Sequence, residues 1–240
     1  MGLFTERQQG YALDAGVDRT RLVDQARTID RISERYMREA GIGPGMRVLD
    51  LGSGMGDVAL LAGRVVGPGG HVLGIERSPE LLAAAHERIR DLGVTNVDLV
   101  EGDVTRLPEL DGAAFDAVVG RLILMHVTDP AGVLRAASAL VRAGGTVLAM
   151  EYDTAWLPSH PQVALWEQTV EMLRAALVGA GMHARMGLEL RGAFVEAGLS
   201  APEMRSEQDV GGGPDWSGYE VLAQTVRASL PLITRAGLAP

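Results

Sequence analysis

The chain has 240 residues, a formal net charge of −9 and no cysteine. An acidic chain without a basic stripe argues against a nucleic-acid partner, and the missing cysteines exclude disulfides and thiolate catalysis. All 22 basic residues are arginine, which excludes Schiff-base chemistry and a lysine general base. Because no apolar run reaches the ~20 residues of a membrane span and the N-terminus lacks signal-peptide features, we expect a cytoplasmic protein that makes no membrane contact.

The first part of the chain, residues 1–45, is predicted to form an N-terminal helical arm. Residues 1–20 are polar and irregular, whereas residues 20–40 repeat apolar side chains at steps of three and four, which is typical of an amphipathic helix. Gly41, Gly43 and Pro44 are expected to end that helix.

The stretch from Arg47 to Asp57 organises the rest of the chain. A short apolar run leads into glycines at alternate positions (Gly52, Gly54 and Gly56), and an amphipathic helix pattern follows at once. This order predicts a buried strand, a tight glycine turn and a helix start. Glycine lets the backbone approach a ligand closely, and a helix N-terminus favours negative charge. The turn therefore suits a nucleoside-type cofactor with an anionic end.

Residues 46–151 alternate strands and helices and are predicted to form the cofactor-binding core. This rhythm indicates an α/β fold with a Rossmann-like, doubly wound, mainly parallel sheet. Ligands of such sheets lie at the carboxyl ends of the strands. The later strands are expected at His71 to Glu76, Val97 to Val100, Phe115 to Val119 and Thr146 to Met150, with a helix ending at Gly144-Gly145 before the last of them.

Residues 152–240 break this rhythm and are predicted to complete the same single domain. A long helix, Val163 to Leu177, is interpreted as a cover over the acceptor site or as a plain packing helix. A shorter helix, a sixth strand at Pro202 to Val210 and a terminal helix at Trp216 to Ile233 follow, but no clear seventh strand. The cover is also expected to supply either an adaptable methionine wall or core filling, from Met172, Met182 and Met186.

Four polar side chains follow four successive predicted strands, so they are expected to converge at one edge of the sheet. They are Asp50, Glu76, Asp103 and Arg121. A carboxylate such as Glu76 can accept hydrogen bonds from both ribose hydroxyls. Asp103 can accept from the adenine amine while the N–H of Val104 donates to a ring nitrogen, and Asp50 lies where an amino group or a bridging water can be held.

This motif order resembles class I S-adenosylmethionine-dependent methyltransferases, in particular the branch that acts on small molecules in natural-product and other secondary metabolism. The resemblance spans roughly Tyr11 to Met150 and is carried by VLDLGSGMGD, GIERS, EGDV, FDAVVGRLILMHVTDP and AGGTVLAMEYD. It implies S-adenosyl-L-methionine as cofactor and S-adenosyl-L-homocysteine as product.

The resemblance also assigns the cofactor contacts by segment. The methionine end falls to Asp50 and the glycine turn, the ribose to Glu76 and Arg77, and the adenine to the EGDV segment. Two residues after the fourth strand would lie near the sulfonium, and two in the arm would reach the cofactor carboxylate. The complete set is Tyr11, Gln25, Asp50, Gly52, Ser53, Gly54, Glu76, Arg77, Gly102, Asp103, Val104, Arg121 and Leu122.

The reaction is expected to be an in-line displacement that moves a methyl group to oxygen, nitrogen or carbon of a small, mainly apolar acceptor. Alignment alone supplies an effective molarity of ~10⁵ M or more. The candidate general bases are His126, Glu151 and Asp153, with His160 as a further one. Each has a structural alternative: His126 can brace the next helix, and the two acids can cap a loop. No metal is expected, because Arg121 stands where metal-dependent relatives place an acidic ligand.

Two other functions are considered. A nucleotide-dependent dehydrogenase, an NAD(P)-linked Rossmann oxidoreductase, needs a third glycine one residue later than Gly56, and short-chain members need a lysine that this chain lacks. A non-catalytic S-adenosylmethionine-binding protein is not excluded by the sequence. The partners expected are a small-molecule methyl acceptor and, for assembly, a second copy in a homodimer.

Overall fold

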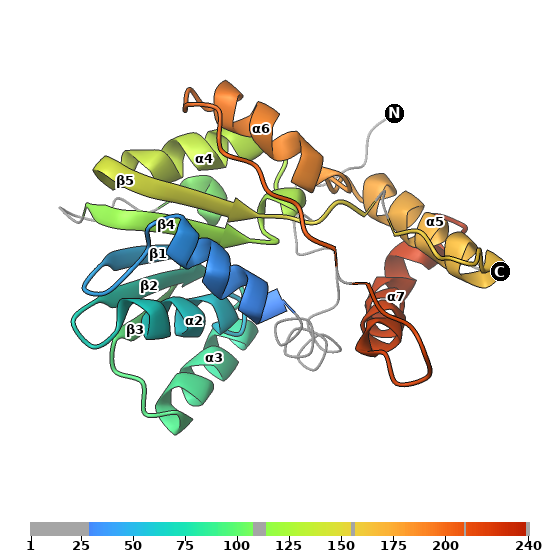
Figure 1. Cartoon of the computed structure of the whole chain (residues 1–240), viewed down its shortest axis with the longest axis horizontal. Helices are drawn as coiled ribbons and strands as arrows, with labels where there is room; N and C mark the ends of the chain where they lie inside the picture. Colours follow the sequence, from blue (N-terminus) through green and yellow to red (C-terminus); the bar gives the residue numbers. More distant parts are fainter. Residues whose placement is uncertain (1–28, 108–113, 155–156, 209, 239–240) are drawn as a thin grey trace.

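The computed structural model describes residues 29–107, 114–154, 157–208 and 210–238. Its centre is a five-stranded sheet in which all neighbours run parallel, in the order β3-β2-β1-β4-β5 (Figure 1). The predicted Rossmann-like α/β fold is therefore confirmed. The strands are β1 (Arg47–Leu51), β2 (His71–Glu76), β3 (Val97–Glu101), β4 (Phe115–Arg121) and β5 (Val141–Met150).

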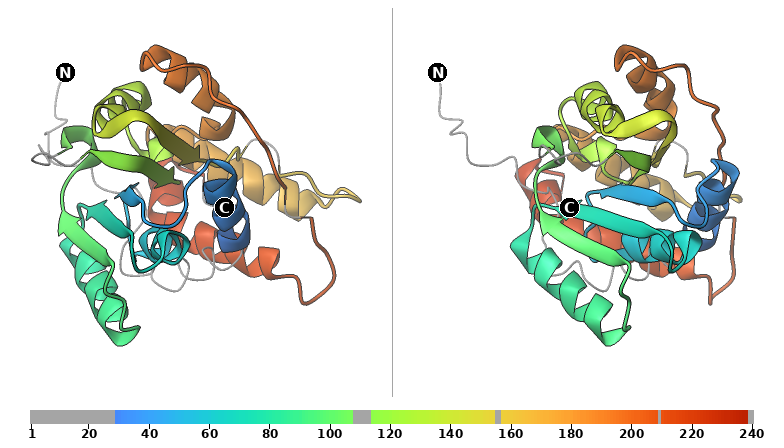
Figure 2. Two further views of the ribbon diagram at one scale, coloured as in Figure 1. Left: turned by 60° about the vertical axis from the view of Figure 1, so that its left-hand side comes forward. Right: turned by 90° about the vertical axis from the view of Figure 1, so that its left-hand side faces the viewer.

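Helices cover both faces of this sheet (Figure 2). On one face lie a helix over residues 29–39 and the two helices that follow β1 and β2; on the other lie the later helices. The bounds are α2 (Asp57–Val66), α3 (Pro79–Asp91), α4 (Pro130–Ala139), α5 (Ala164–Gly179), α6 (Met186–Glu196) and α7 (Ser217–Arg235), with short 3-10 turns η1 (Val104–Arg106) and η2 (Leu124–His126).

The two faces are built from the alternation of side chains along each strand. In β1, Val48 belongs to the core under α2 and α3, whereas Leu49 and Leu51 belong to the core under the later helices. Successive strand residues point to opposite faces, which places Asp50 on the same side as Val48. The charged side chain is thus buried beside α2, at the carboxyl end of the central strand.

Two of the helices after β5, α5 and α7, lie beyond the carboxyl end of the sheet. Figure 1 shows α5 and α7 next to each other on the side toward which the strand arrows point, and these two helices make extensive mutual contacts. Buried residues of both helices, such as Leu173 and Ile233, join the core under the sheet. The α5 helix therefore packs as part of the fold at the edge where a ligand is expected.

The predicted sixth strand, Pro202 to Val210, is wrong for every residue of that segment that the structure describes, since none is in a strand. The chain instead passes beside the 29–39 helix on its way from α6 to α7 (Figure 2). Arg205 pairs with Glu39, and Glu207 pairs with Arg35. The segment has few apolar side chains, so contacts with charged residues on a helix satisfy it better than burial in a sheet.

The start of β5 also differs from the prediction. The α4 helix ends at Ala139, and the strand begins at Val141 rather than at Thr146. Between these two points the register with β4 slips, from Phe115↔Val141 to Ala117↔Thr146. The glycine pair that suggested the end of a helix therefore forms an irregular section of the strand.

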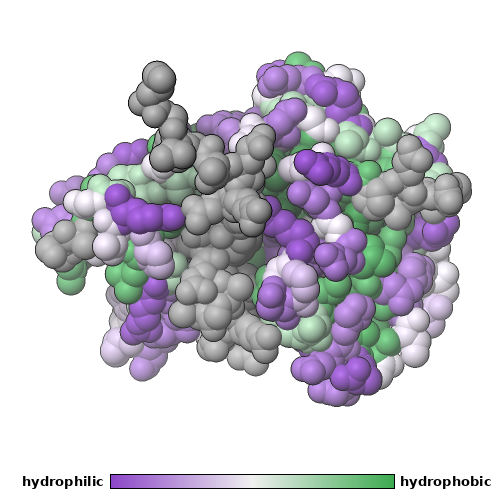
Figure 3. Space-filling model, turned by 180° about the vertical axis from the view of Figure 1, so that it is seen from behind, coloured by the Kyte–Doolittle hydropathy of each residue, from purple (hydrophilic) through white to green (hydrophobic). Residues whose placement is uncertain are grey.

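On the face that Figure 3 shows, seen from behind, hydrophilic and hydrophobic residues are interspersed. Among the helices that the structure describes, none combines the length and apolarity needed to cross a bilayer.

Candidate cofactor site

The glycine turn after β1 has the backbone geometry that its sequence predicts. Gly52 and Gly54 both adopt positive φ, +67° and +53°. A methyl group added at Gly52 would lie 2.5 Å from Cδ1 of Ile123, so this glycine is needed for packing. One added at Gly54 would meet no described atom within 4 Å. The turn thus leaves open space beside Gly54 while Gly52 is closely packed.

Asp50 is a buried carboxylate beside this turn, with 1% of its surface exposed. Neither of its oxygens has a hydrogen-bond partner among the residues that the structure describes. Burial raises the pKa of Asp50 to about 7; Arg121 and the nearby backbone N–H of Ala59, which lies outside hydrogen-bond geometry, oppose the shift, and the negative charges of Glu76 and Asp57 add to it. A buried acceptor without a donor is costly, so this side chain is suited to receive a donor from a ligand.

Glu76, at the end of β2, connects two loops of the site. Its carboxylate accepts the N–H of Gly54 at 2.8 Å on one oxygen and the N–H of Ser78 at 2.8 Å on the other. A carboxylate has about four acceptor positions. Two of them are therefore left for hydroxyl groups of a ligand, as predicted for the ribose, while Arg77 next to it is exposed.

The third strand brings the EGDV segment to the same edge. The N–H of Gly102 donates to the backbone oxygen of Glu76 at 3.0 Å, which ties this segment to β2. Asp103 caps the η1 turn by accepting the N–H and the hydroxyl of Thr105, each at 2.8 Å. Val104 is buried. The side chain of Asp103 is thus partly engaged, as a turn cap would be.

Arg121, at the end of β4, is held by residues that sequence reasoning did not single out. Its guanidinium donates to Asp30 at 2.8 Å and to Ser33 at 3.1 Å, both on the 29–39 helix. Only 7% of the Arg121 side chain is exposed. Asp30 and Ser33 share one helix face, but nothing in the sequence links that face to a residue some ninety positions later.

The structure gives Glu151 a different environment from the one expected of a general base. Its carboxylate accepts the N–H groups of Ile123, Leu124 and Met125, at 3.0, 2.7 and 3.4 Å. The residue is partly accessible, yet the carboxylate is surrounded by protein atoms. Burial raises the pKa of Glu151 to about 7, against the three backbone hydrogen bonds. The sequence offered a cap on the loop that follows Glu151 as the alternative to a base; the carboxylate instead caps the turn after β4.

The other candidate bases lie on three segments of the chain. His126 ends the η2 turn and is half-buried. Asp153 lies 3.9 Å from Arg185, on the segment that leaves β5. His160 is exposed on the way to α5.

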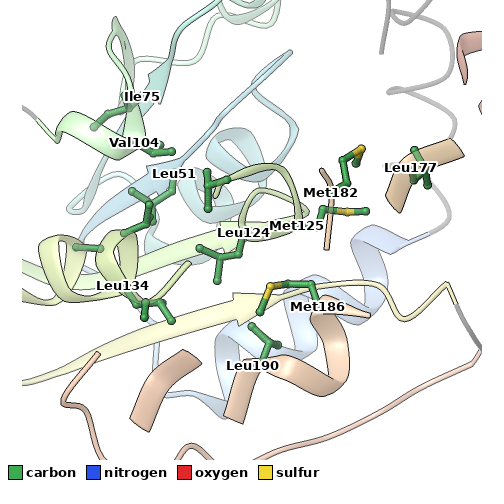
Figure 4. Packing of buried hydrophobic residues seen from close by; sticks show 14 of the residues in the cluster. Leu51, Ile75, Val104, Leu124, Met125, Leu134, Leu177, Met182, Met186 and Leu190 are labelled. Carbon is green, nitrogen blue, oxygen red and sulfur yellow. The ribbon is translucent and has the colours of Figure 1, made fainter. Parts of the chain in front are cut away.

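The remaining predictions concern the arm, Leu122, the methionines of the cover and metal ligands. Tyr11 and Gln25 lie outside the described residues. Leu122 adopts positive φ, 55°, which is strained for a residue other than glycine. Met182 and Met186 are buried in the core (Figure 4), so these two fill space rather than form an adaptable wall. Within the described ranges, no three histidine or acidic side chains are grouped as metal ligands would be.

These features allow a test of whether the site fits the predicted cofactor. S-adenosylmethionine carries an amino group, two ribose hydroxyls and an adenine. The buried, unpaired carboxylate of Asp50 matches the first, and the spare acceptor positions of Glu76 match the second. The open space at Gly54 leaves room for close approach of a ligand. The residues present therefore fit the group.

Comparison with known proteins points to the same chemistry. The model of a family described as "Methyltransferase domain" matches residues 42–198. The ubiquinone/menaquinone biosynthesis C-methyltransferase of Vibrio cholerae is 34% identical over 127 residues, which are 52% of this chain and 48% of that protein. An arsenite methyltransferase of Halobacterium salinarum is 29% identical over 170 residues, 71% of this chain and 41% of that protein. The chain spans about half the length of the curated relatives it matches, or less.

Solved structures with similar folds were also found. A S-adenosylmethionine-dependent methyltransferase from Aquifex aeolicus has 22% identity and a TM-score of 0.49, covering 56% of this chain and 73% of that one. The N-terminal domain of EvdMO1, solved with S-adenosylhomocysteine and D-fucose, has 31% identity and a TM-score of 0.43, covering 50% and 49%.

The family match extends over more than half of the chain and includes the glycine turn and all five strands. It decides against the nucleotide-dependent dehydrogenase considered from the sequence, and it agrees with the fit of the strand-end side chains to an adenosyl cofactor. The chain belongs to the methyltransferase-domain family, as the resemblance to class I S-adenosylmethionine-dependent methyltransferases predicted.

Proposed function

We propose that this chain transfers a methyl group from S-adenosylmethionine to a small, mainly apolar molecule. The observation that carries the proposal is Asp50, a buried carboxylate with no hydrogen-bond partner in the described chain. It lies directly before a glycine turn that leaves open space at Gly54. A buried charge in this state destabilises the fold, and a cationic ligand group that binds there offsets the cost.

Each part of the site has a binding role in this proposal. Asp50 accepts from the amino group of the cofactor, and Glu76 accepts from the ribose hydroxyls while it holds Gly54. The Val104 N–H and the Asp103 carboxylate bind the adenine edge. Because these residues come from three neighbouring strands, they fix both ends of an extended ligand at once.

The contribution of the chain to catalysis is mainly alignment. The cofactor, when bound, supplies a methyl group on a sulfonium, which is a good leaving group without protonation. Arg121 would repel a cation nearby, but its charge is offset by Asp30 at 2.8 Å and by Asp50. The neutralised guanidinium can then support the end of β4 without opposing a positively charged ligand.

The apolar character of the acceptor is inferred from the turn after β4. Residues 122–125 are Leu-Ile-Leu-Met, and the first two are partly exposed. The relatives are named for a quinone-pathway C-methylation and for arsenite. These 240 residues contain no cysteine, and a soft acceptor such as arsenite prefers thiolate ligands. An organic acceptor therefore fits this chain better.

A general base is needed only if the acceptor carries a proton. Glu151 is committed to the backbone of the η2 turn, which leaves His126 and Asp153 as the candidates. A histidine side chain in general suits proton transfer near neutral pH. The homodimer, the cytoplasmic location and the absence of metal and nucleic acid remain predictions from the sequence.

Calorimetric titration of the purified chain with S-adenosylhomocysteine tests the cofactor assignment, with NADH as the comparison ligand. We expect heat of binding from S-adenosylhomocysteine only. Methyl-labelled cofactor incubated with a panel of apolar phenols, quinols and amines then tests turnover. Binding without labelled product from any acceptor would favour the non-catalytic binding protein, and binding of NADH alone would overturn the proposal.

A further inference from the structure

Backbone N–H groups of the turn between β4 and the η2 segment donate to the end of β5. The N–H of Leu122 donates to the backbone oxygen of Met150 at 2.9 Å. The next three N–H groups all donate to one side chain, the carboxylate of Glu151. Four consecutive amides thus point toward two consecutive residues of β5 and its extension.

The backbone conformation explains how these amides converge. Leu122 is in the left-handed region at φ 55°, and Ile123 follows in the right-handed helical region at φ −114° and ψ −41°. Successive N–H groups in such a pair of conformations form a concave arrangement that binds anions. Here the anion is supplied by the chain itself, since Glu151 fills the concavity.

Side chains fix the same turn from its other side. Leu124 and Met125 are buried, 1% and 6% exposed, and Figure 4 shows both among the side chains of the core under the later helices. Ile123 packs against the turn after β1, because a methyl group added at Gly52 would lie 2.5 Å from its Cδ1. Ile123 thus fills the space that a side chain at position 52 would need.

We propose that Glu151 is a positioning residue, which holds the turn after β4 so that Ile123 supports the glycine turn that binds the cofactor. This proposal rests on the proposed function for its link to the cofactor. In this proposal, Glu151 at the end of β5 acts on Gly52 through the turn that carries Ile123. It also separates Glu151 from His126 and Asp153, the residues left as candidates for proton transfer.

The hydrogen-bond geometry supports positioning over proton transfer. One oxygen of Glu151 accepts two N–H groups and the other accepts one. A base that took a proton on either oxygen would place a donor against a backbone donor, and the turn would lose part of its support. Burial raises the pKa of Glu151 to about 7, but no charged side chain contributes to that shift.

The test uses three variants of the full chain: Glu151→Ala, Glu151→Gln and, as a matched surface control, Asp98→Asn. Asp98 is exposed and pairs only with His71 in the described contacts. Two quantities are measured for each variant: the affinity for S-adenosylhomocysteine by calorimetry, and hydrogen exchange of the amides of residues 122–126 and 48–51.

For Glu151→Ala we expect at least a tenfold loss of affinity and rapid exchange at residues 123–125, with the β1 amides still protected. Glu151→Gln keeps one acceptor oxygen and is expected to lie between Ala and the unchanged chain, which also keeps the test valid if the Ala variant does not fold. The control should match the unchanged chain. Unchanged affinity and unchanged protection of residues 123–125 in Glu151→Ala would show that Glu151 does not hold the turn, and the proposal would be wrong.

Two further outcomes are decisive. If protection is lost equally across β1 and the turn in Glu151→Gln, Glu151 stabilises the fold as a whole and the positioning proposal is wrong. If the unchanged chain gives no heat with S-adenosylhomocysteine, the proposed function fails, while hydrogen exchange still decides whether Glu151 holds the turn.

Discussion

Two carboxylates at the ends of β1 and β5 are alike in their pKa and opposite in their surroundings. Asp50 and Glu151 both have a pKa raised to about 7 by burial. Asp50 has no hydrogen-bond partner in the described chain, whereas Glu151 accepts three backbone N–H groups. A similar pKa therefore does not indicate a similar role.

The contrast in hydrogen bonding distinguishes two kinds of residue at this edge of the sheet: those that contact a ligand and those that hold the site in shape. Hydrogen bonds from the backbone satisfy Glu151 whether or not a ligand is present, so its environment is complete. Asp50 remains unsatisfied until a donor arrives. In an unliganded site, we therefore take the unsatisfied buried group as the ligand contact and the satisfied one as the residue that shapes the site.

The largest expected effect is on Asp50 itself. The Asp50→Asn variant removes a buried charge, so we expect the affinity for S-adenosylhomocysteine to fall about 10- to 100-fold, equivalent to about 1.5–3 kcal/mol for a hydrogen bond to a charged group. The same change should raise the free energy of unfolding at pH 8 by up to about 4 kcal/mol, since about three pKa units are involved.

The effect of Asp50 on the free energy of unfolding depends on pH, and its sign follows from the direction of the pKa shift. The pKa of Asp50 is higher in the folded chain than in the unfolded one, so its contribution to stability is present below about pH 4 and is lost as the pH rises through 7. Chemical denaturation at pH 4, 6 and 8 should show Asn and Asp converging at pH 4. A variant that is equally destabilised at every pH would show that Asp50 has an internal donor.

The next largest effects separate the two glycines of the turn. Gly52→Ala places a methyl group against Ile123 and strains a positive φ, so we expect a loss of about 2–4 kcal/mol in unfolding free energy. Gly54→Ala meets open space and should lose only about 1–2 kcal/mol from backbone strain, while affinity for the cofactor falls at least tenfold.

Thermal unfolding and calorimetry measure these two quantities on the same samples. The test is whether Gly52→Ala loses more unfolding free energy than Gly54→Ala, whatever the absolute size of the two losses. If Gly54→Ala bound S-adenosylhomocysteine as tightly as the unchanged chain, the space beside Gly54 would not be part of the ligand site.

The smallest effect is expected from Asp30→Asn. This change leaves the Arg121 guanidinium without its ion-pair partner while 7% of the Arg121 side chain is exposed. We expect a loss of about 1–2 kcal/mol in stability at pH 6, less than for a fully buried pair because Asp30 is partly solvated. The freed positive charge should also lower the pKa of Asp50, which moves the midpoint of its pH-dependent stability to lower pH.

The positions of the site residues at the ends of β1, β2 and β3 were predictable, because each follows from residues that are neighbours in the sequence. A hydrophobic run, alternate glycines and a helix pattern specify the turn at Gly52 and Gly54 within ten residues. Glu76 and Asp103 follow their strands directly, and a parallel sheet brings such positions to one edge. The order of these elements carries the information, so no tertiary contact had to be known.

The support of the site was not predictable, because it depends on pairings between distant residues. Glu151 lies 28 positions from Ile123, and Arg121 lies 91 positions from Asp30. Polar residues at such distances have many possible partners in a sequence. The predicted strand at residues 202–210 failed for a related reason, since its charged side chains pair with residues of the 29–39 helix, and the local pattern does not reveal these partners.

That pairing has a consequence for the order in which the molecule is assembled. Arg205 and Glu39 are 166 positions apart, and both side chains are substantially exposed. The described part of this segment adds no strand to the sheet, and exposed ion pairs return little free energy. The segment before α7 should therefore dock late in folding, onto a sheet already formed, and be among the first parts to detach in native-state fluctuations.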